Sequence, residues 1–413
     1  MNMPEEDGSR LASNKRKLRT LLFSSLYPSS IRPGHGIFVE TRLRELLGSS
    51  QVETRVVSPV PWFFSTNPRF GEYALIASTP ARERHHGIDV LHPRYFLPPR
   101  FGMTVAPLSM AIGALPAIRK LQDEGFDFDL IDAHYFYPDG VAAAILAKWL
   151  HKPYVVTARG TDLNLIPQHA LPRRMIEWAA RGAVASIGVC AALVDVLRAW
   201  GLPDQQLLVM RNGVDLQRFR PMPQEQARSE LGIRDGPVLL SVGYLIERKR
   251  HHVAIRALAK ILPDHPDARL LIVGDGPDLP ALLQLARELG LAERVTFAGA
   301  QPNADLFRWY SAADALLLAS SREGWANVLL ESMACGTPVV ATRIWGTPEV
   351  VAKPVAGRLI DDGTPELFAH AIILLLNQYP DRREVRTYAE GFSWQATTDA
   401  QLRLFNRVAA SRG

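Results

Sequence analysis

Short apolar runs alternate with amphipathic stretches throughout the first half of the chain. The apolar runs cover residues 18–24, 53–59, 129–134, 154–157 and 185–189, and stretches of helical periodicity lie between them, as at 37–47, 141–150 and 191–200. Strands buried on both faces are typical of a parallel sheet that is covered by helices. The pattern therefore predicts an α/β domain with a doubly wound parallel sheet.

The same pattern starts again in the second half. Apolar runs at 238–243, 269–274, 294–298, 315–319 and 338–341 are each followed by turn residues and a helical stretch. A chain of 413 residues is too long for one ordinary core, so we expect two such domains. Gly201-Leu-Pro-Asp204 breaks a helix near the join. We predict a disordered lead-in at 1–16, a first domain at 17–205 and a second at 206–392.

Composition and charge narrow the class of protein. The chain is 47% hydrophobic and 22% charged with a net charge of +5, of which +4 lies in residues 1–205 (23 Lys and Arg against 19 Asp and Glu). This excess is too diffuse for a nucleic-acid partner, but it suits anionic ligands and an anionic membrane surface. Two cysteines, Cys190 and Cys335, make a disulfide framework implausible and favour a reducing, cytoplasmic location.

Three segments bear on whether the chain contacts or crosses a membrane. The most apolar run, residues 101–118, contains Pro107 and Pro116, and we interpret it as loop and helix rather than as a membrane span. The N-terminus lacks the apolar core of a signal peptide. Residues 93–103 mix aromatic and basic side chains, a mixture that suits a lipid interface, and an ordinary acceptor-side loop is the alternative.

The densest group of chemically significant residues lies between 321 and 340. Glu323 follows a predicted strand, and Glu331 lies eight residues further on, inside a helix that starts near Ala326. A helix N-terminus is a ready site for a diphosphate, because its free N–H groups and positive dipole end face the ligand. Glu331 would then reach ribose hydroxyls and Glu323 the hydroxyls of a sugar. A surface acid is the alternative for Glu331.

These residues carry a family resemblance. Glu323, seven intervening residues, Glu331 and then Met333-Ala-Cys-Gly-Thr-Pro-Val-Val340 resemble the signature of glycosyltransferase family 4. Four more family-like segments occur in the right order: Asn212-Gly-Val-Asp215, Ser241-Val-Gly-Tyr-Leu-Ile-Glu-Arg-Lys249, Val273-Gly-Asp-Gly-Pro277 and Gly346-Thr-Pro-Glu349. The resemblance implies a GT-B fold, in which two Rossmann-like domains face each other across a cleft.

The resemblance also implies an activity. Family members are retaining, metal-independent enzymes that use nucleotide diphosphate sugars, and the acceptor would be a glycan, a lipid-linked or a small molecule, in cell-surface or exopolysaccharide synthesis. The terminal helix, at 393–413, would cross back onto the first domain. A nucleotide-sugar epimerase and a non-catalytic sugar-binding relic are the alternatives.

The site residues that the resemblance implies come from both halves. His134, Lys249 and Glu323 are the expected catalytic residues, and Gly36, Gly243, Lys249, Glu323, Gly324, Asn327, Val328 and Glu331 are expected to bind the donor. Lys249 would act as a point charge on the phosphates. The family usually has Arg directly after the glycine at 243, and here it is Tyr244; Arg248 or Arg250 could replace that cation, and solvated surface charges are the alternative.

Three polar residues at predicted strand ends have open roles. His134 would lie beside the donor sugar, and a hydrogen-bonded core histidine is the alternative. Arg159 stands where the family often has His, and we expect it to hold an anionic acceptor or the diphosphate. Asp162 either contacts the acceptor or caps a helix. No spacing of Asp and His indicates a metal site, because Asp127-Phe-Asp129 precedes a strand instead of following one.

Overall fold

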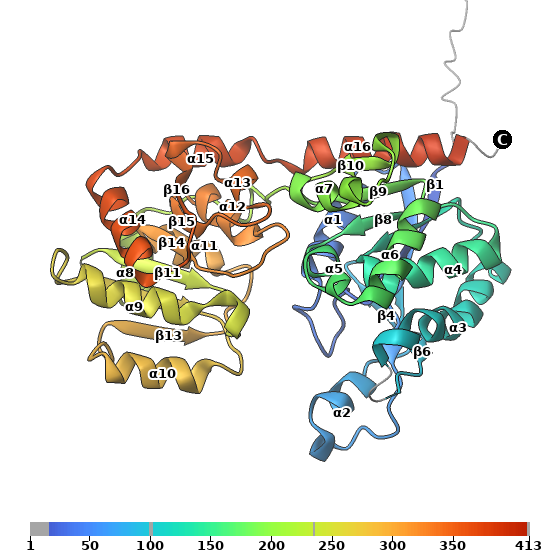
Figure 1. The fold of residues 1–413 in the computed structure, drawn as a ribbon, viewed down its shortest axis with the longest axis horizontal. Helices are drawn as coiled ribbons and strands as arrows, with labels where there is room; N and C mark the ends of the chain where they lie inside the picture. The colour runs from blue at the N-terminus through green and yellow to red at the C-terminus, as the bar shows by residue number, and fades with distance from the viewer. Residues whose placement is uncertain (1–15, 99–101, 234–235, 411–413) are drawn as a thin grey trace, which may run out of the picture.

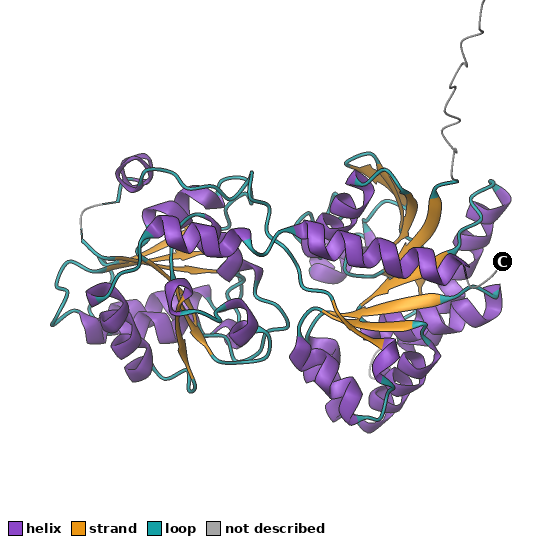
Figure 2. Cartoon of the chain, turned by 90° about the horizontal axis from the view of Figure 1, so that it is seen from above, coloured by secondary structure: helices purple, strands orange, loops and turns teal. Residues whose placement is uncertain are grey.

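Two α/β domains lie side by side in the computed structural model, which describes residues 16–98, 102–233 and 236–410 (Figures 1 and 2). The first sheet has the strand order β10-β9-β8-β7-β1-β2-β5-β4, and every neighbouring pair is parallel except β4 with β5. Its strands are β1 (Leu18–Phe23), β2 (Val52–Val57), β4 (Arg82–His85), β5 (Ile88–Leu91), β7 (Leu130–His134), β8 (Tyr154–Ala158), β9 (Ala185–Gly188) and β10 (Leu207–Val209). Two short strands, β3 (Val60–Pro61) and β6 (Arg94–Tyr95), pair separately.

Helices follow the strands of the first sheet. They are α1 (Ile37–Gly48), α2 (Glu72–Ala77), α3 (Gly102–Asp123), α4 (Val141–Leu150), α5 (Thr161–Asn164), α6 (Ala170–Gly182) and α7 (Ala191–Ala199). A one-turn helical segment, η2 (Phe136–Gly140), comes directly after β7. Strands β7 and β8 are buried at every position, as expected for a sheet covered on both faces.

The second domain holds an all-parallel sheet of order β13-β12-β11-β14-β15-β16. Its strands are β11 (Val238–Val242), β12 (Arg269–Val273), β13 (Val295–Gly299), β14 (Ala315–Leu318), β15 (Val339–Thr342) and β16 (Gly357–Ile360). Its helices are α8 (Gln224–Leu231), α9 (His251–Ile261), α10 (Leu279–Glu288), α11 (Leu306–Ala312), α12 (Asn327–Ala334), α13 (Thr347–Val350), α14 (Pro365–Asn377) and α15 (Arg382–Glu390). The predicted class, two doubly wound α/β domains, is confirmed.

The apolar pattern did not predict β4, β5, β10 and β16. Of these, β4, β10 and β16 are the outermost strands of their sheets, with a neighbour on one side only, and β4 reads Arg-Glu-Arg-His. An edge strand needs little apolar surface, so its sequence carries a weak signal. Because β10 belongs to the first sheet, that domain extends through Val209, beyond the predicted end at 205. The predicted lead-in, apart from Arg16, lies outside the described residues.

Helix α3 corrects one expectation. Residues 102–123 form one continuous helix despite Pro107 and Pro116, where loop and helix had been predicted. By length and composition α3 is able to cross a membrane, and 33% of its most apolar 18-residue window is buried within the fold. The buried side, which includes Met110, Ala111 and Ala114, belongs to the core of the first domain.

The last helix, α16 (Trp394–Ala410), leaves the second domain and packs on the first (Figure 1). It contacts α1, β1 and β7. Leu402, Leu404, Phe405 and Val408 form an apolar cluster with strand residues of the first sheet such as Leu130. The two domains are therefore joined twice, by the segment after Val209 and by this helix.

We expect that replacing Phe405 with Ala will lower the free energy of unfolding by about 3–5 kcal/mol, because a fully buried aromatic side chain would leave a cavity under α16. Thermal unfolding followed by calorimetry would measure the change. Arg403→Ala, an exposed substitution on the same helix, is the matched control. Equal melting temperatures for the two variants would mean that α16 does not stabilise the first domain.

Candidate active site

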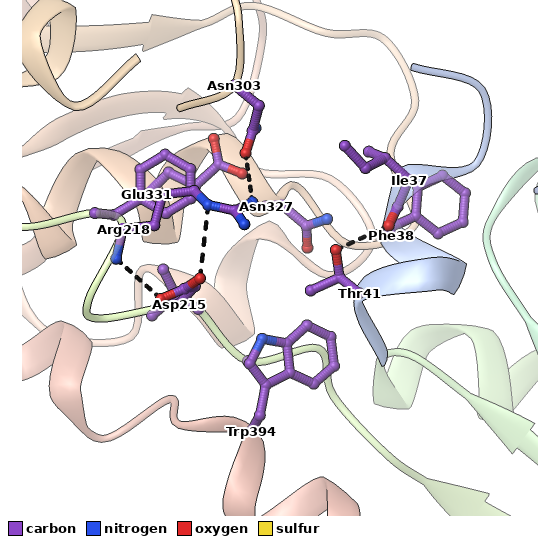
Figure 3. Close-up of a pocket in the computed structure, with 12 residues that line it drawn as sticks. Ile37, Phe38, Thr41, Asp215, Arg218, Asn303, Asn327, Glu331 and Trp394 are labelled. Carbon is purple, nitrogen blue, oxygen red and sulfur yellow. Dashed lines mark hydrogen bonds and ion pairs between the residues drawn. The ribbon is translucent and has the colours of Figure 1, made fainter. Parts of the chain in front are cut away.

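Two helix N-termini face one pocket between the domains (Figure 3). Helix α1 of the first domain contributes Ile37, Phe38 and Thr41, and α12 of the second contributes Asn327 and Glu331. Free N–H groups at helix N-termini attract anionic groups. The pocket therefore lies where a phosphate group would be stabilised by both domains.

Gly36 directly precedes α1 and has a left-handed backbone, with φ 68°. A Cβ atom at this position would lie 2.3 Å from the backbone carbonyl carbon of Leu26. No other residue fits without moving the chain, so Gly36 fixes how the first turn of α1 meets the pocket. Whether a donor phosphate contacts Gly36 stays a prediction.

The predicted cation and carboxylate of the second domain are paired. Nζ of Lys249 lies 2.6 Å from Oε1 of Glu323, and Nη1 of Arg248 lies 3.4 Å from the same oxygen. Burial alone would raise the pKa of Glu323, but the Lys249 and Arg248 charges outweigh it and hold the pKa below its ordinary value. The Glu323 side chain is therefore an ionised hydrogen-bond acceptor, and its contact with sugar hydroxyls stays a prediction.

Arg248 thus lies in the site, whereas Arg250 does not. A Cβ on Gly363 would come within 2.6 Å of Nη1 of Arg250, which places that guanidinium beside the loop that follows β16. Tyr244, in the position of the usual arginine, is exposed. Of the two predicted substitutes for the missing cation, only Arg248 is in place.

Glu331 points from α12 toward the pocket (Figure 3). Its carboxylate accepts a hydrogen bond from the Tyr310 hydroxyl at 2.7 Å. Burial raises the pKa of Glu331 to about 7, although the Tyr310 hydrogen bond and the Arg218 and Lys249 charges act against the rise. The carboxylate is thus under-solvated, and ligand hydroxyls that donate to it would relieve that cost. Tyr310 gave no signal in the sequence.

Arg218 is a site residue that sequence reasoning missed. Its Nη1 donates to Oδ1 of Asn303 at 2.8 Å, and its Nε lies 3.6 Å from Oδ2 of Asp215 (Figure 3). The guanidinium lines the pocket beside Glu331. The sequence clue to Arg218 was its position, three residues after Asp215 at the end of the family-like segment 212–215.

His134 is a buried, hydrogen-bonded histidine. Nη2 of Arg159 lies 2.5 Å from its Nδ1, and Oδ2 of Asp132 lies 3.3 Å from its Nε2. Arginine can only donate, so Nδ1 accepts and the ring proton sits on Nε2, which donates to Asp132. Burial lowers the pKa of His134 to about 4, although Asp132 opposes the shift, so the ring is neutral at neutral pH. Both nitrogens have partners within the protein, and the predicted contact with a donor sugar stays a prediction.

Asp132 belongs to a longer chain of hydrogen bonds. Nε2 of Gln401, on α16, donates to Oδ2 of Asp132 at 3.1 Å, and Nε of Arg42 donates to Oε1 of Gln401 at 3.2 Å. Asp132 could have been noticed from the sequence, because it lies two residues before His134 on the same face of the strand. The tertiary fold alone brings Gln401 there.

Arg159 extends this chain into the second domain. Its Nη1 donates to Oδ1 of Asn212 at 3.1 Å, and Nδ2 of Asn212 donates to Oδ1 of Asn327 at 3.2 Å. Asn327 is the first residue of α12. Burial holds the pKa of Arg159 well below its usual value. An uninterrupted set of hydrogen bonds therefore links the terminal helix to the helix that carries Glu331.

The loop after β8 touches the second domain directly. Both oxygens of Asp162 accept from backbone N–H groups, among them those of Phe136 and Gly160, at 2.8 and 2.7 Å. Asp162 is the second residue of α5 and does not cap it, because the N-cap position is Gly160 and carries no side-chain hydrogen bond. Its carboxylate instead ties the loop after β8 to the start of η2, and contact with an acceptor stays a prediction. A Cβ on Gly324 would lie 2.0 Å from the carbonyl oxygen of Arg159, so only glycine permits this approach between the domains.

The remaining predicted residues frame the same region. Gly243 follows β11, and a Cβ built there would lie 3.6 Å from Cε of Lys249. Val328 is the second residue of α12 and is half-buried. Asp127 pairs with Lys152 at 2.6 Å, away from the site. Within the described parts of the chain, no three His, Cys, Asp or Glu side chains are grouped so that they could hold a metal ion.

Two family models match the chain. The model described as Glycosyltransferase Family 4 matches residues 75–218, and the model described as Glycosyl transferases group 1 matches residues 223–392. Together they cover both domains and the segment that carries the site.

Two curated proteins illustrate the sequence similarity to known enzymes. A D-inositol 3-phosphate glycosyltransferase of Corynebacterium urealyticum is 31% identical over 325 residues, 73% of this chain and 77% of that protein. An N-acetyl-alpha-D-glucosaminyl L-malate synthase of Bacillus anthracis is 30% identical over 254 residues, 60% of this chain and 66% of that protein.

Solved structures share the two-domain fold. Sucrose-phosphate synthase from Thermosynechococcus elongatus superposes with a TM-score of 0.77 at 21% identity, over 96% of this chain and 100% of that one. Anabaena HepE in complex with UDP superposes with a TM-score of 0.70 at 20% identity, over 95% and 100%. The GT-B architecture is confirmed by these neighbours.

The raised pKa of Glu331 predicts a pH-dependent effect of Glu331→Gln. The native state holds this proton more tightly than the unfolded chain does, so wild-type stability falls as the pH rises from about 4.5 to about 7. The amide avoids that loss while it still accepts from Tyr310. At pH 8 we expect the free energy of unfolding of the variant to exceed that of wild type by about 1–2 kcal/mol, a value reduced for the residual exposure of the side chain. Near pH 4.5 we expect the two proteins to be equally stable.

Melting temperatures across this pH range measure the difference, and Glu384→Gln, at an exposed position on α15, is the control. A Glu331→Gln curve that runs parallel to wild type at every pH would contradict the assignment.

Proposed function

The chain belongs to the glycosyltransferases of group 1 and family 4, and on that premise we propose that it transfers a sugar from a nucleotide diphosphate donor to an acceptor hydroxyl with retention at the anomeric carbon. The observation that carries the proposal is the pairing of Lys249 with Glu323, whose carbonyl accepts from Asn164 of the first domain, near Glu331 and the N-terminus of α12 in the pocket. The cation and the helix N-terminus suit a diphosphate, the ionised carboxylate of Glu323 suits the hydroxyls of a sugar, and the under-solvated carboxylate of Glu331 suits those of a ribose.

The donor contacts follow from this arrangement. Lys249 and the N–H groups of α12 hold the diphosphate, with Arg248 or Arg218 as the second cation. Glu331 accepts hydrogen bonds from ribose hydroxyls, and Glu323 accepts them from the hydroxyls of the transferred sugar. The solved HepE complex with UDP, which shares this fold, supports a nucleotide diphosphate as the donor's leaving part.

Transfer needs no covalent nucleophile from the protein. As the bond from the anomeric carbon to the diphosphate oxygen breaks, Lys249 and the helix amides stabilise the charge that develops on the departing phosphate. That phosphate oxygen takes the proton of the acceptor hydroxyl, which attacks the same face, so configuration is retained. The buried contacts between the domains exclude water and so limit hydrolysis of the donor.

The first domain would hold the acceptor, a glycan, a lipid-linked or a small molecule. The names of the two relatives refer to inositol 3-phosphate and malate, which supports a polar acceptor. We place the reaction in the cytoplasm, in cell-surface or exopolysaccharide synthesis, with peripheral contact to an anionic membrane.

Two other activities are distinguishable. An epimerase would convert the donor to an isomer without any acceptor, whereas a transferase leaves it intact or hydrolyses it slowly. A non-catalytic relic would bind a nucleotide sugar without turnover on any acceptor. The retained pair of Lys249 and Glu323 favours the transferase over the relic.

The donor site predicts a large effect of Lys249→Met. Loss of the charge on the departing phosphate should lower turnover by at least about 100-fold, with little change in circular dichroism. Lys260→Met is the matched control, because Lys260 lies on α9 and pairs with exposed Glu366 at 2.9 Å. If both variants turn over donor like wild type, the donor-site assignment is wrong.

Stereochemistry tests the reaction itself. A panel of nucleotide sugars ranked by thermal shift would first identify the donor, because binding to the native state raises apparent stability. Proton NMR of the product should then show the same anomeric configuration as the donor, in EDTA as well as in buffer. An inverted product would overturn retention, and activity lost in EDTA but restored by Mg²⁺ or Mn²⁺ would overturn metal independence.

A further inference from the structure

The first domain exposes an unusual amount of apolar surface at one end. Trp62, Phe64 and Tyr73 are 52%, 65% and 68% exposed, and Leu108 and Ile112 of α3 are 50% and 57% exposed. Phe96, after β6, is 59% exposed and lies between the two groups. We call these six side chains the apolar end. Figure 1 shows α2, β6 and α3 together on this side of the domain, with α2 projecting from it.

Helix α3 presents an apolar side to solvent as well as to the core. Its sequence contains no charged residue from Gly102 to Ile118, and then Arg119 and Lys120 follow, both exposed. A surface helix normally carries charged or polar residues on its outer face. Here the outer face stays apolar for four turns and ends in two cations, a pattern typical of helices that lie in a membrane interface.

The aromatic side chains of the apolar end and the exposed side chains of α3 belong to one continuous surface. The N–H of Trp62 donates to the carbonyl of Tyr95 at 2.7 Å, and the Ser109 hydroxyl of α3 donates to the carbonyl of Phe96 at 2.5 Å. The backbone from Tyr95 to Phe96 therefore joins the aromatic loop to α3. The whole forms one surface rather than scattered apolar side chains.

The charges around the apolar end are mainly positive. Between residues 61 and 124 of the described chain, the exposed cations are Arg69, Arg82, Arg84, Arg119 and Lys120, and the exposed carboxylates are Glu72, Asp123 and Glu124, of which Glu124 lies 3.9 Å from Lys120. An apolar surface that includes Trp and Tyr and has an excess of cations near it complements anionic lipid headgroups above an acyl layer.

Helix α3 connects the apolar end with the segment that follows His134. Helix α3 packs against η2, the turn that begins two residues after His134. Met110 and Ala114 on the inner side of α3 are fully buried, so the helix can lie along a bilayer surface but cannot cross it without unfolding the domain. A hydroxyl presented at a membrane surface would thus be near the first-domain side of the cleft.

We propose that the apolar end docks this protein onto an anionic lipid bilayer, with the outer face of α3 and the aromatic side chains of the loop after β3 and of α2 in the interface. The inference rests on the proposed function only for its purpose, which is to deliver a membrane-borne acceptor to the cleft. Docking itself requires neither donor nor turnover.

Flotation with vesicles tests the docking. The full chain should float with vesicles of phosphatidylcholine and phosphatidylglycerol, and more weakly with phosphatidylcholine alone. Leu108→Gln with Ile112→Gln should lower the bound fraction at least about tenfold, because two apolar side chains are no longer available for burial in lipid. Leu367→Gln with Leu374→Gln, on exposed positions of α14, is the matched control and should bind like wild type.

Charge is tested separately. Arg119→Gln with Lys120→Gln should remove most of the preference for phosphatidylglycerol, whereas Arg287→Gln with Lys353→Gln, exposed on the second domain, should not. Wild type that floats with neither vesicle overturns the proposal, as does undiminished binding of the α3 variant. A wild-type dimer that the α3 variant dissociates, with no flotation, would mean that a second copy of the chain covers this surface.

The outcome is separable from that of the proposed function. Slow donor hydrolysis in solution, measured as release of nucleoside diphosphate, should be the same in the α3 variant and in wild type. A wild-type chain that floats with vesicles but transfers sugar to no acceptor would count against the transferase and leave the docking in place.

Discussion

The arrangement of the site depends on one buried chain of hydrogen bonds between the domains. It runs from Gln401 on the terminal helix through Asp132 and His134 to Arg159, and then through Asn212 to Asn327 at the start of α12. Asp132, His134 and Gln401 are buried, and Arg159 and Asn327 are partly buried, so removal of one member leaves another without full compensation. The position of the donor helix relative to the first domain is therefore fixed largely by buried side chains.

The two carboxylates of the site differ in their electrostatics. Burial withdraws solvent from both Glu331 and Glu323, but the consequences are opposite. Glu323 gains Lys249 and Arg248 and its pKa falls, whereas Glu331 gains mainly the Tyr310 hydroxyl and its pKa rises to about 7. The site thus contains one carboxylate that the protein already satisfies and one that a ligand would satisfy. Such a division suits a donor that brings hydroxyl groups to Glu331.

Two further features of the first domain matter for the site: the glycines at its contact with the second domain, and its exposed apolar surface. Gly324 permits the backbone of the two domains to touch, and Gly36 permits the first turn of α1 to face the pocket. At the other end of the first domain, α3 buries one side in the core and leaves the other apolar and open. A single helix thereby connects the loop after His134 with a surface suited to lipid.

The sequence by itself determined the two doubly wound domains, because strands buried on both faces leave an apolar signal that edge strands such as β4 and β10 do not. It also determined which polar residues stand at strand ends and helix starts, including Lys249, Glu323 and Glu331. Only the tertiary structure decided which of them meet. Gln401 lies 269 positions from Asp132 in the chain, and no local pattern encodes that contact. The pKa of Glu331 likewise depends on solvent withdrawn by packing, which spacing along the sequence does not reveal.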